Sequence, residues 1–357
     1  MNRQALASDP QITPVPWTAD APGFPPSLRI LRKIGHGGMS KVYQAIQEPL
    51  GRTVAVKILT ATSPESQARF TREAQLLAAL DHENLIHVHD FVCTEAQHTI
   101  IMEYVDGLDL SHLAIGDLRF PPRVAAWVGL HLARALSYLH GRGLIHRDIK
   151  PGNVILTREG RLKLVDFGIA KHIHTPRLSP DDVGVGTPSY MSPERLAGEM
   201  ADSRADLYSV GVLLYRLLAG RLPFEDTGAD DLFEQIRHRR PAPLPGVPAF
   251  LSRIVLRCLE KKPDDRYLNA DQLRADLERF LQYSGDPLQG ELELVEFLEA
   301  RSAVPAGALR QKRTELEAAG RVPELRPGLL RYRRWLWAGG LILAQALLLG
   351  AWWVLRT

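Results

Sequence analysis

Residues able to do chemistry gather in two short runs near the middle of the chain. The first run, His146-Arg147-Asp148-Ile149-Lys150-Pro151-Gly152-Asn153, combines a carboxylate, an ammonium and an amide. The second run is Asp166-Phe167-Gly168. A carboxylate can accept or orient a proton, and carboxylate and amide oxygens are the ligands that a small, hard cation prefers. Either run alone is weak evidence for a catalytic site, so its interpretation depends on the elements that surround it.

Two further features lie nearer the N-terminus. Residues 35–40 read Gly-His-Gly-Gly-Met-Ser, and Lys57 closes the run Val54-Ala55-Val56-Lys57. Because glycine has no Cβ, a glycine loop lets phosphate oxygens approach backbone N–H groups closely. The loop lies between strands and lacks a Gly-Lys-Ser/Thr ending, so it fits neither a Rossmann turn nor a Walker loop. On its own it is also compatible with an ordinary turn.

The elements that must position these residues begin as strands. Residues 28–60 and 85–105 show the short alternating runs of strands. Between them, residues 65–80 have a helical period, with Phe70, Ala74, Leu77 and Leu80 on one face. Glu73 lies on this helix, one element after Lys57.

From about residue 110 the pattern becomes mainly helical. Residues 122–140 predict a long amphipathic helix. Residues 203–219 are apolar on nearly every side, which is typical of a central core helix. We therefore predict an α+β fold in which a small β-rich lobe precedes a larger α-rich lobe.

The motifs form an ordered set: glycine loop, strand lysine, helix glutamate, His-Arg-Asp run, Asp-Phe-Gly run and Ser192-Pro193-Glu194. In this order the chain resembles the eukaryotic-like (Hanks-type) serine/threonine protein kinases of bacteria, especially the membrane-anchored branch. The resemblance covers residues 28–282. It implies a bilobal kinase fold that transfers the γ-phosphate of ATP to Ser or Thr of protein substrates in bacterial signalling, with autophosphorylation.

The resemblance implies a role for each charged residue of the motifs. Asp148 is the catalytic base, and Lys150 steadies the transferred phosphate. Lys57 pairs with the α- and β-phosphates and is held by Glu73. An unpaired lysine after Val-Ala-Val would be poorly solvated, which disfavours a merely exposed Lys57. Glu73 alone would be read as an exposed helix glutamate, and only its place after Lys57 favours the pair.

The resemblance also implies the ligands of the metal and of the nucleotide. Asn153 and Asp166 hold Mg²⁺, with Mn²⁺ as an alternative. The residues expected to bind ATP, besides Lys57, come from the glycine loop, the sheet and the segment linking the lobes: Ile34, Gly35, Gly37, Gly38, Val42, Ala55, Met102, Glu103, Val105, Asp109 and Ile155. For Val42, Ala55 and Ile155, ordinary core packing is compatible with this role.

Three other residues resemble structural positions of the family. Asp206 corresponds to the residue that braces the catalytic loop, and Arg266 to the arginine that pairs with Glu194. Two positions depart from the family pattern, because serine stands for the third loop glycine (Ser40) and for the alanine of the Ala-Pro-Glu turn (Ser192). Neither replaces a residue to which the resemblance assigns catalysis.

Arg147, before the presumed base, suggests control by phosphate on the activation loop between Asp166 and Glu194. The candidate phosphorylation sites there are Thr175, Ser179, Thr187 and Ser189. We hypothesise that Asp181 and Asp182 partly replace such a phosphate; two exposed loop acids are the alternative. Lys150 and Thr187 favour Ser/Thr over Tyr as the acceptor.

The C-terminal part of the sequence predicts a membrane anchor. Residues 335–355 carry no charge, have Trp at both ends and, at about 1.5 Å per residue, match the thickness of a bilayer core. Arg331, Arg333 and Arg334 precede this run and only Arg356 follows it, which places the kinase domain in the cytoplasm. We expect a single pass through the inner (plasma) membrane, contact with lipid, and no extracytoplasmic sensor in the 356–357 tail.

The remaining segments connect and flank these domains. Residues 1–27, with six prolines, predict a disordered arm. Residues 283–334 predict a basic juxtamembrane linker with a short helix over 291–300, which has Leu292, Val295 and Leu298 on one face. Small residues at 340/344 and 346/350 are compatible with helix pairing, hence with a homodimer.

Composition limits the alternatives. Two cysteines, Cys93 and Cys258, exclude a disulfide scaffold and predict buried free thiols.

The net charge of +3 is the sum of a mildly acidic body and a basic segment, 301–334, which has nine Lys/Arg and three Asp/Glu. No basic patch in the body points to nucleic acid. A catalytically weak ATP-binding scaffold and a small-molecule kinase remain alternatives, although the Thr187 turn and Glu194 favour protein substrates.

Overall fold

The computed structural model describes residues 27–36, 40–48, 50–60, 63–94, 97–166, 188–225, 232–285, 287–301 and 303–318. The chain divides into two compact units, residues 1–314 and 315–357. Both sheets, the helices up to residue 299, and Lys57, Asp148 and Asp166 belong to the first unit.

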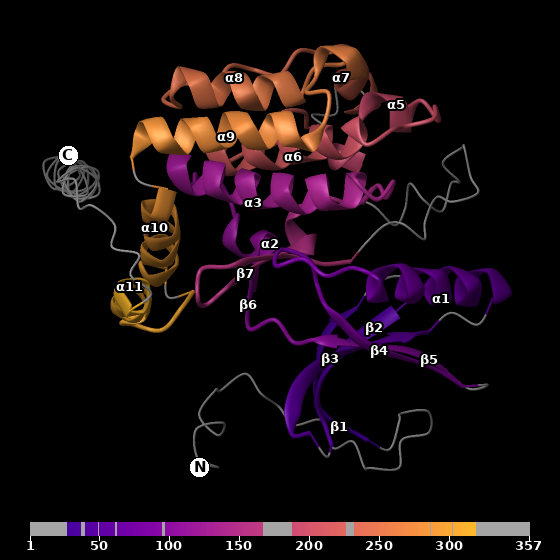
Figure 1. Cartoon of the computed structure of the whole chain (residues 1–357). Coiled ribbons are helices and arrows are strands. Elements are labelled where there is room, and N and C mark those ends of the chain that lie inside the picture. The colour runs from indigo at the N-terminus through magenta and orange to yellow at the C-terminus, as the bar shows by residue number, and fades with distance from the viewer. Residues whose placement is uncertain are drawn as a thin grey trace, which may run out of the picture. The chain divides into compact units, whose positions relative to one another are not determined.

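The first lobe is built on a five-stranded antiparallel sheet of order β1-β2-β3-β5-β4 (Figure 1). Its strands are β1 (Leu28–His36), β2 (Ser40–Gln47), β3 (Arg52–Leu59), β4 (Val88–Cys93) and β5 (His98–Glu103). Successive side chains of β3 face opposite sides. Val54, Val56 and Ile58 join a small apolar cluster on one face, which leaves Ala55 and Lys57 on the other.

Helix α1 (Pro64–Ala78) packs against the sheet by the face that the sequence predicts. The side chain of Ser63 caps its first turn by accepting a hydrogen bond from the Ser66 N–H, and Pro64 begins the helix where its missing N–H costs nothing. Phe70, Ala74 and Leu77 are buried in the main apolar core. This packing fixes the helix and presents Glu73 to β3.

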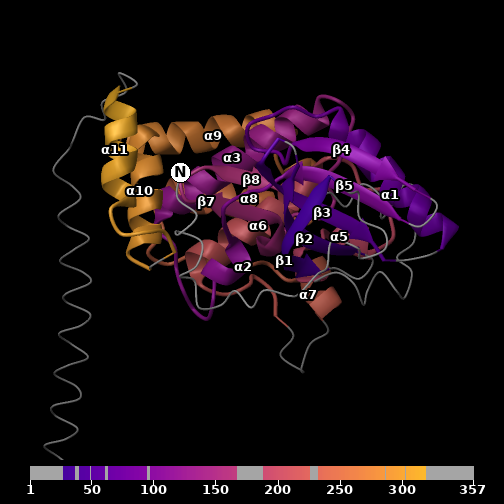
Figure 2. The same cartoon turned by 90° about the horizontal axis from the view of Figure 1, so that it is seen from below.

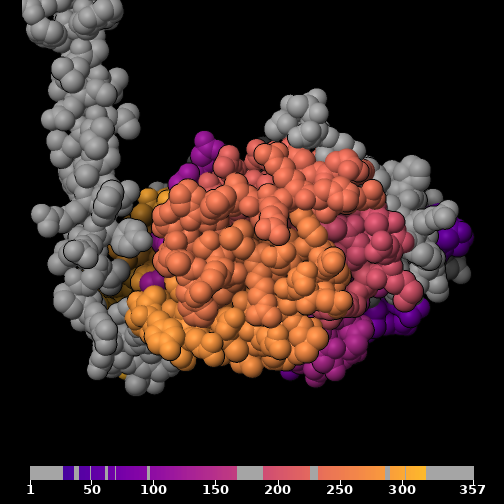
Figure 3. All heavy atoms as spheres, turned by 90° about the horizontal axis from the view of Figure 1, so that it is seen from above, coloured from indigo at the N-terminus to yellow at the C-terminus, as the bar shows by residue number. Residues whose placement is uncertain are grey.

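The second lobe is mainly helical. It contains a small antiparallel sheet of order β6-β7-β8. Its elements in chain order are β6 (Gly107–Asp109), α2 (Leu110–Leu113), α3 (Pro122–His140), the 3₁₀ helix η1 (Pro151–Asn153), β7 (Val154–Thr157), β8 (Leu162–Leu164), η3 (Pro188–Tyr190), α5 (Pro193–Leu196), α6 (Arg204–Ala219), α7 (Leu232–His238), α8 (Ala249–Cys258), η4 (Pro263–Asp265), α9 (Ala270–Ser284), α10 (Pro287–Glu299) and α11 (Ala308–Ala318). Figure 3 shows the outer face of this lobe, where the orange of α8 and α9 dominates.

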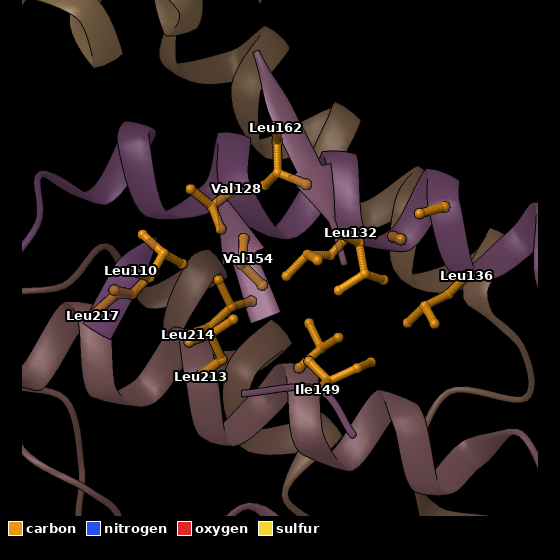
Figure 4. Close-up of a cluster of buried hydrophobic side chains, with 14 of the residues drawn as sticks. Leu110, Val128, Leu132, Leu136, Ile149, Val154, Leu162, Leu213, Leu214 and Leu217 are labelled. Atoms are coloured by element: carbon orange, nitrogen blue, oxygen red, sulfur yellow. The ribbon is translucent and has the colours of Figure 1, made fainter. Parts of the chain in front are cut away.

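Helices α3 and α6 form the centre of the second lobe. The predicted helix over 122–140 is confirmed as α3, and 13 of the 16 residues of α6 are buried, as its all-round apolar pattern indicates. Figure 4 shows Ile149, Val154 and Leu162 among the leucines and valine of these two helices. The loop of residues 146–153, called the catalytic loop after the family it resembles, and β7 are therefore anchored in a rigid apolar core.

The structure differs from the sequence predictions at Cys93 and in the helix predicted over 291–300. Cys258 is buried, but Cys93 is exposed because it ends the edge strand β4, so the prediction of two buried thiols is wrong for Cys93. The helix predicted over 291–300 begins earlier, at Pro287, and it buries Leu294 and Phe297 in addition to Val295 and Leu298. No helix among the described residues is long and apolar enough to cross a bilayer; the run 335–355 lies outside those residues.

Candidate active site

Lys57 joins three segments that are distant in sequence. Its Nζ lies 2.7 Å from Oε1 of Glu73 on α1 and 3.0 Å from Oδ1 of Asp166, which follows β8. The Lys57 and Glu73 side chains are only 11% and 10% exposed. Burial alone would lower the pKa of the Lys57 ammonium, but the carboxylates of Asp166 and Glu73 outweigh burial and raise that pKa. Lys57 therefore stays charged, and its charge lowers the pKa of Asp166.

The catalytic loop brings Asp148, Lys150 and Asn153 into one hydrogen-bonded group. Oδ2 of Asp148 accepts from Lys150 Nζ at 2.9 Å and from Asn153 Nδ2 at 3.0 Å. Two donors on one oxygen fix the direction of the carboxylate. A half-buried carboxylate held in this way suits a group that orients a hydroxyl and takes its proton.

The backbone of the loop is held in an uncommon conformation. Arg147 has φ of 66° and Asp166 has φ of 52°, in the left-handed region that disfavours residues with a Cβ. Asp206, buried on α6, accepts from the N–H of His146 and of Arg147, each at 2.8 Å. The Arg195 guanidinium donates to the Arg147 carbonyl at 2.6 Å. These bonds hold the backbone at Arg147 and offset its strain. Asp206 therefore braces this loop, as the sequence predicts.

A single hairpin carries the two expected metal ligands. Asn153 directly precedes β7, and Asp166 follows β8 by one residue, Val165, whose N–H donates to the Asn153 carbonyl at 2.9 Å. Asn153 Nδ2 also donates to the carbonyls of Asp148 and Asp166. Because the amide nitrogen is engaged, the amide oxygen is the atom suited to a cation.

The donor chemistry fits a small, hard divalent cation. Among the described residues, no group of three or more His, Cys, Asp or Glu could hold a metal by itself. Mg²⁺ commonly takes one or two protein oxygens and completes its shell with waters and substrate phosphates. One carboxylate and one amide, beside a lysine, match that type of site better than an all-protein cage.

The sheet places several expected nucleotide-binding residues together. Val42 lies opposite Lys57 in the β2–β3 register, and Ala55 lies opposite Met102 in the β3–β5 register. Since Ala55 and Lys57 share a face of β3, these apolar side chains lie on the same face of the sheet as the Lys57 side chain. Gly35 faces Val42 in the register of β1 and β2. Gly37 and Gly38 lie outside the described residues, and Ile34 is partly exposed.

The small sheet of the second lobe and the segment before it carry the other residues expected to bind the nucleotide. Ile155 lies opposite Asp109 in the register of β6 and β7. The Asp109 carboxylate caps α2, accepting from the N–H groups of Ser111 and His112. The first turn of α2 therefore sets the orientation of the Asp109 carboxylate. Val105, the last expected hinge residue, is half-buried.

Glu103 is held by a contact that the sequence does not reveal. Its Oε1 accepts from Lys163 Nζ at 2.6 Å and from the N–H of His87 at 2.8 Å. Lys163 lies on β8, so this ion pair ties the end of β5 to the hairpin of the second lobe. Local sequence gives no signal for it, because the two residues belong to different sheets.

Another ion pair, between Arg266 and Glu194, lies deep in the helical lobe. Both nitrogens of the Arg266 fork donate to the Glu194 carboxylate at 2.8 Å, as the family pattern implies. Burial raises the pKa of Glu194, but the bonds from Arg266 outweigh it and the pKa falls below its ordinary value.

Of the four candidate phosphorylation sites on the activation loop, Ser189 is the one that the structure describes, and it is buried. Thr175, Ser179 and Thr187 lie outside the described residues, as do Asp181 and Asp182.

Comparison with known proteins agrees with this geometry. The sequence model of the protein kinase domain matches residues 28–276. A probable serine/threonine-protein kinase of Streptomyces coelicolor is 40% identical over 268 residues, which is 71% of this chain and 40% of that protein. Serine/threonine-protein kinase Pkn1 of Myxococcus xanthus is 39% identical, over 71% of this chain and 38% of its own. PknB of Mycobacterium leprae is 38% identical, over 71% and 42% respectively.

The chain thus spans about two fifths of the length of these relatives. The similarity nevertheless covers the whole ordered set of motifs and both lobes. Members of this family use ATP and a divalent metal ion. The family predicted from the motifs is confirmed, and the chain belongs to the protein kinase family.

Proposed function

We propose that this chain is a serine/threonine protein kinase that transfers the γ-phosphate of ATP to protein substrates and to itself. The observation that carries this proposal is the Lys57 ammonium held between Glu73 and Asp166. Phosphoryl transfer depends on placing positive charge and oxygen ligands around the phosphates. The cluster supplies both, and the Asn153 amide links it to the catalytic base by donating to the Asp166 carbonyl and to the Asp148 carboxylate.

The reaction follows from the groups on the catalytic loop. The substrate hydroxyl oxygen forms a bond to the γ-phosphorus, and the bond from that phosphorus to the β–γ bridging oxygen breaks. ADP leaves with the electron pair, and Asp148 takes the hydroxyl proton. Lys150, 2.9 Å from Asp148, offsets negative charge on the transferred group. Lys57 would pair with the α- and β-phosphates and offset their negative charge.

We assign the metal ligands to Asn153 and Asp166, with Mg²⁺ as the ion and Mn²⁺ as an alternative. A divalent ion held by these two residues would supply positive charge beside the phosphates of the nucleotide. Removal of divalent ions with EDTA should stop transfer, and Mg²⁺ should restore it. If Ca²⁺ but not Mg²⁺ or Mn²⁺ restored activity, this metal assignment would be wrong.

Specificity for Ser and Thr is supported by Lys150 and by the names of the relatives, which are serine/threonine-protein kinases.

The basic residues at 331–334 and the uncharged run 335–355 support a single pass through the inner membrane, with the kinase domain cytoplasmic. Small residues spaced by four in that run support pairing of two copies. Vesicle flotation of the full chain against residues 1–330 tests the anchor, since only the full chain should float with lipid.

The decisive experiment measures phosphate transfer from Mg-ATP to the chain itself and to a basic protein acceptor. Wild type and Asp148→Asn are compared as full chains in lipid. Transfer to Ser and Thr by wild type alone supports both the reaction and the base. Nucleotide binding without transfer by wild type would favour an ATP-binding scaffold instead.

A further inference from the structure

Helix α10 lies beyond the segment that the kinase family model matches, which ends at residue 276. It packs on the second lobe through a continuous apolar face, in which Leu294, Val295 and Leu298 are almost completely buried. Figures 1 and 2 both show α10 beside β7 and one end of α3. The helix is thus part of the folded body of the kinase domain.

Two aromatic contacts hold α10 against α3 and the residues just before it. The rings of Phe120 and Phe297 lie 4.5 Å apart, centroid to centroid. A Cβ placed on Gly290 would come within 2.8 Å of the Trp127 indole, so the backbone of α10 touches that ring. Fixed aromatic contacts of this kind define one position of a helix along its neighbour.

A shielded ion pair adds specificity to this packing. The Arg123 guanidinium on α3 donates to both carboxylate oxygens of Glu293, at 2.9 and 3.1 Å, and these side chains are 14% and 18% exposed. Arg123 also donates to the Leu281 carbonyl and the Ser284 hydroxyl at the end of α9. One arginine therefore joins α3, α9 and α10.

The other side of α10 meets the closed end of the β7–β8 hairpin. Gly160, in the turn between these strands, has φ of +75°, and a Cβ there would come within 2.8 Å of Val295 Cγ2. The turn is ordered by bonds from the Gly160 N–H to the Thr157 carbonyl and from the Arg161 N–H to Thr157 Oγ1. The turn is therefore packed directly against Val295 of α10.

The open end of the same hairpin carries Asn153 and Asp166. β7 has four residues and β8 has three, so the turn lies only about 13 Å from these ligands at ~3.3 Å per residue. The hairpin is short: β6 pairs with β7 on its other side, and its apolar side chains are buried in the core of the second lobe. A contact at its turn is thus well placed to limit motion at its ligand-bearing end.

We propose that α10 is an intramolecular clamp on the β7–β8 hairpin and that its docking positions Asn153 and Asp166 for Mg-ATP. The positioning residues are Glu293 and Val295, which act through Arg123 and Gly160. The functional part of this inference rests on the proposed roles of Asn153 and Asp166 in metal binding. Undocking of α10 weakens nucleotide affinity more than it slows the transfer step.

The test uses the full chain in lipid with three variants: Glu293→Arg, Val295→Asp and the double variant. Glu296→Arg is the matched control, because it makes the same change on the exposed face of the same helix. Hydrogen exchange of nucleotide-free protein reports the protection of α10, β7 and β8. Steady-state kinetics give the KM for ATP and kcat separately.

We expect α10 and the hairpin to lose protection together in the variants, and the KM for ATP to rise about fivefold or more with a smaller change in kcat. Glu296→Arg should match wild type. Loss of α10 protection with unchanged hairpin exchange and KM would overturn the proposal. Retained protection in all three variants would also overturn it, because these contacts would then not hold the helix. An inactive wild type would count against the proposed function, while the exchange data would still test the clamp.

Discussion

Two of the buried ion pairs among the described residues, one in each lobe, look alike by distance. Lys57 and Glu73 approach to 2.7 Å in the first lobe, and Arg266 and Glu194 to 2.8 Å in the second. Their surroundings differ. Arg266 is completely buried and also donates to backbone carbonyls of three other residues, Glu260, Lys261 and Arg204. Lys57 is shared with Asp166, whose side chain is 48% exposed.

This difference separates structure from chemistry. An arginine fork satisfied on every side locks the segments around it in one geometry. A lysine is a compact charge on a flexible stem, and here it lies where an anion can reach it. The first pair therefore positions a charge, whereas the second holds the helical lobe together.

The largest effect is expected from Arg266→Met. The change leaves Glu194 buried without its partner, so the free energy of unfolding should fall by about 3–5 kcal/mol. Urea unfolding followed by circular dichroism measures this loss. The double variant Arg266→Met/Glu194→Leu should recover part of it, because no buried charge remains. A loss below about 1 kcal/mol for Arg266→Met would show that the Arg266–Glu194 pair does not stabilise the fold in the way that separates it from the Lys57–Glu73 pair.

Lys57→Met should show the opposite balance. We expect phosphate transfer to fall by about 10²–10³, since one preorganised positive group is removed from the phosphates. The free energy of unfolding should fall by less than in Arg266→Met. Lys41→Met is the matched control, because Lys41 is an exposed lysine on the adjacent strand, opposite Ile58. Equal loss of activity in both lysine variants would contradict the assignment.

The pH dependence of stability sharpens the comparison further. Lys57 lowers the pKa of Asp166 in the folded state, so the ionised carboxylate stabilises the fold. This contribution is present above the ordinary aspartate pKa of about 4 and is lost as the pH falls through the lower folded value. The difference in unfolding free energy between wild type and Asp166→Asn should shrink between pH 6 and pH 3. A constant difference would mean that Lys57 does not stabilise the Asp166 carboxylate.

The smallest effect is expected at the surface of the second lobe. Arg204 and Asp264 lie 2.7 Å apart, as close as the buried pairs, but the Asp264 side chain is 89% exposed. Asp264→Asn should therefore change the free energy of unfolding by at most about 1 kcal/mol. The same urea titration measures it. A change as large as that of Arg266→Met would show that distance, and not burial, sets the strength of these pairs.

Much of the fold was predictable because its signals are local. The period of two in β3 and the period near 3.6 over Phe70, Ala74 and Leu77 depend only on neighbouring residues. The all-apolar run of α6 predicts its central place for the same reason. Cys93 was misassigned because the exposure of an edge strand depends on the order of strands, which local sequence does not contain.

The site was predictable in its residue types and not in its supports. The motifs name Lys57, Asp148 and Asp166, whose roles in catalysis remain predictions. The contacts of Arg195 with the Arg147 carbonyl and of Lys163 with Glu103 carry no local signal. They arise only when segments distant in the chain pack together.

The sequence by itself determined the order of motifs, the change from strands to helices and the family, because each depends on residue types and short spacings. Tertiary structure decided which charges meet: Lys57 with two carboxylates from different segments, and Arg123 with a helix beyond the matched domain. The physical reason is that a charge pair depends on distance and burial in three dimensions. Packing of the apolar core sets both, across separations that no local pattern records.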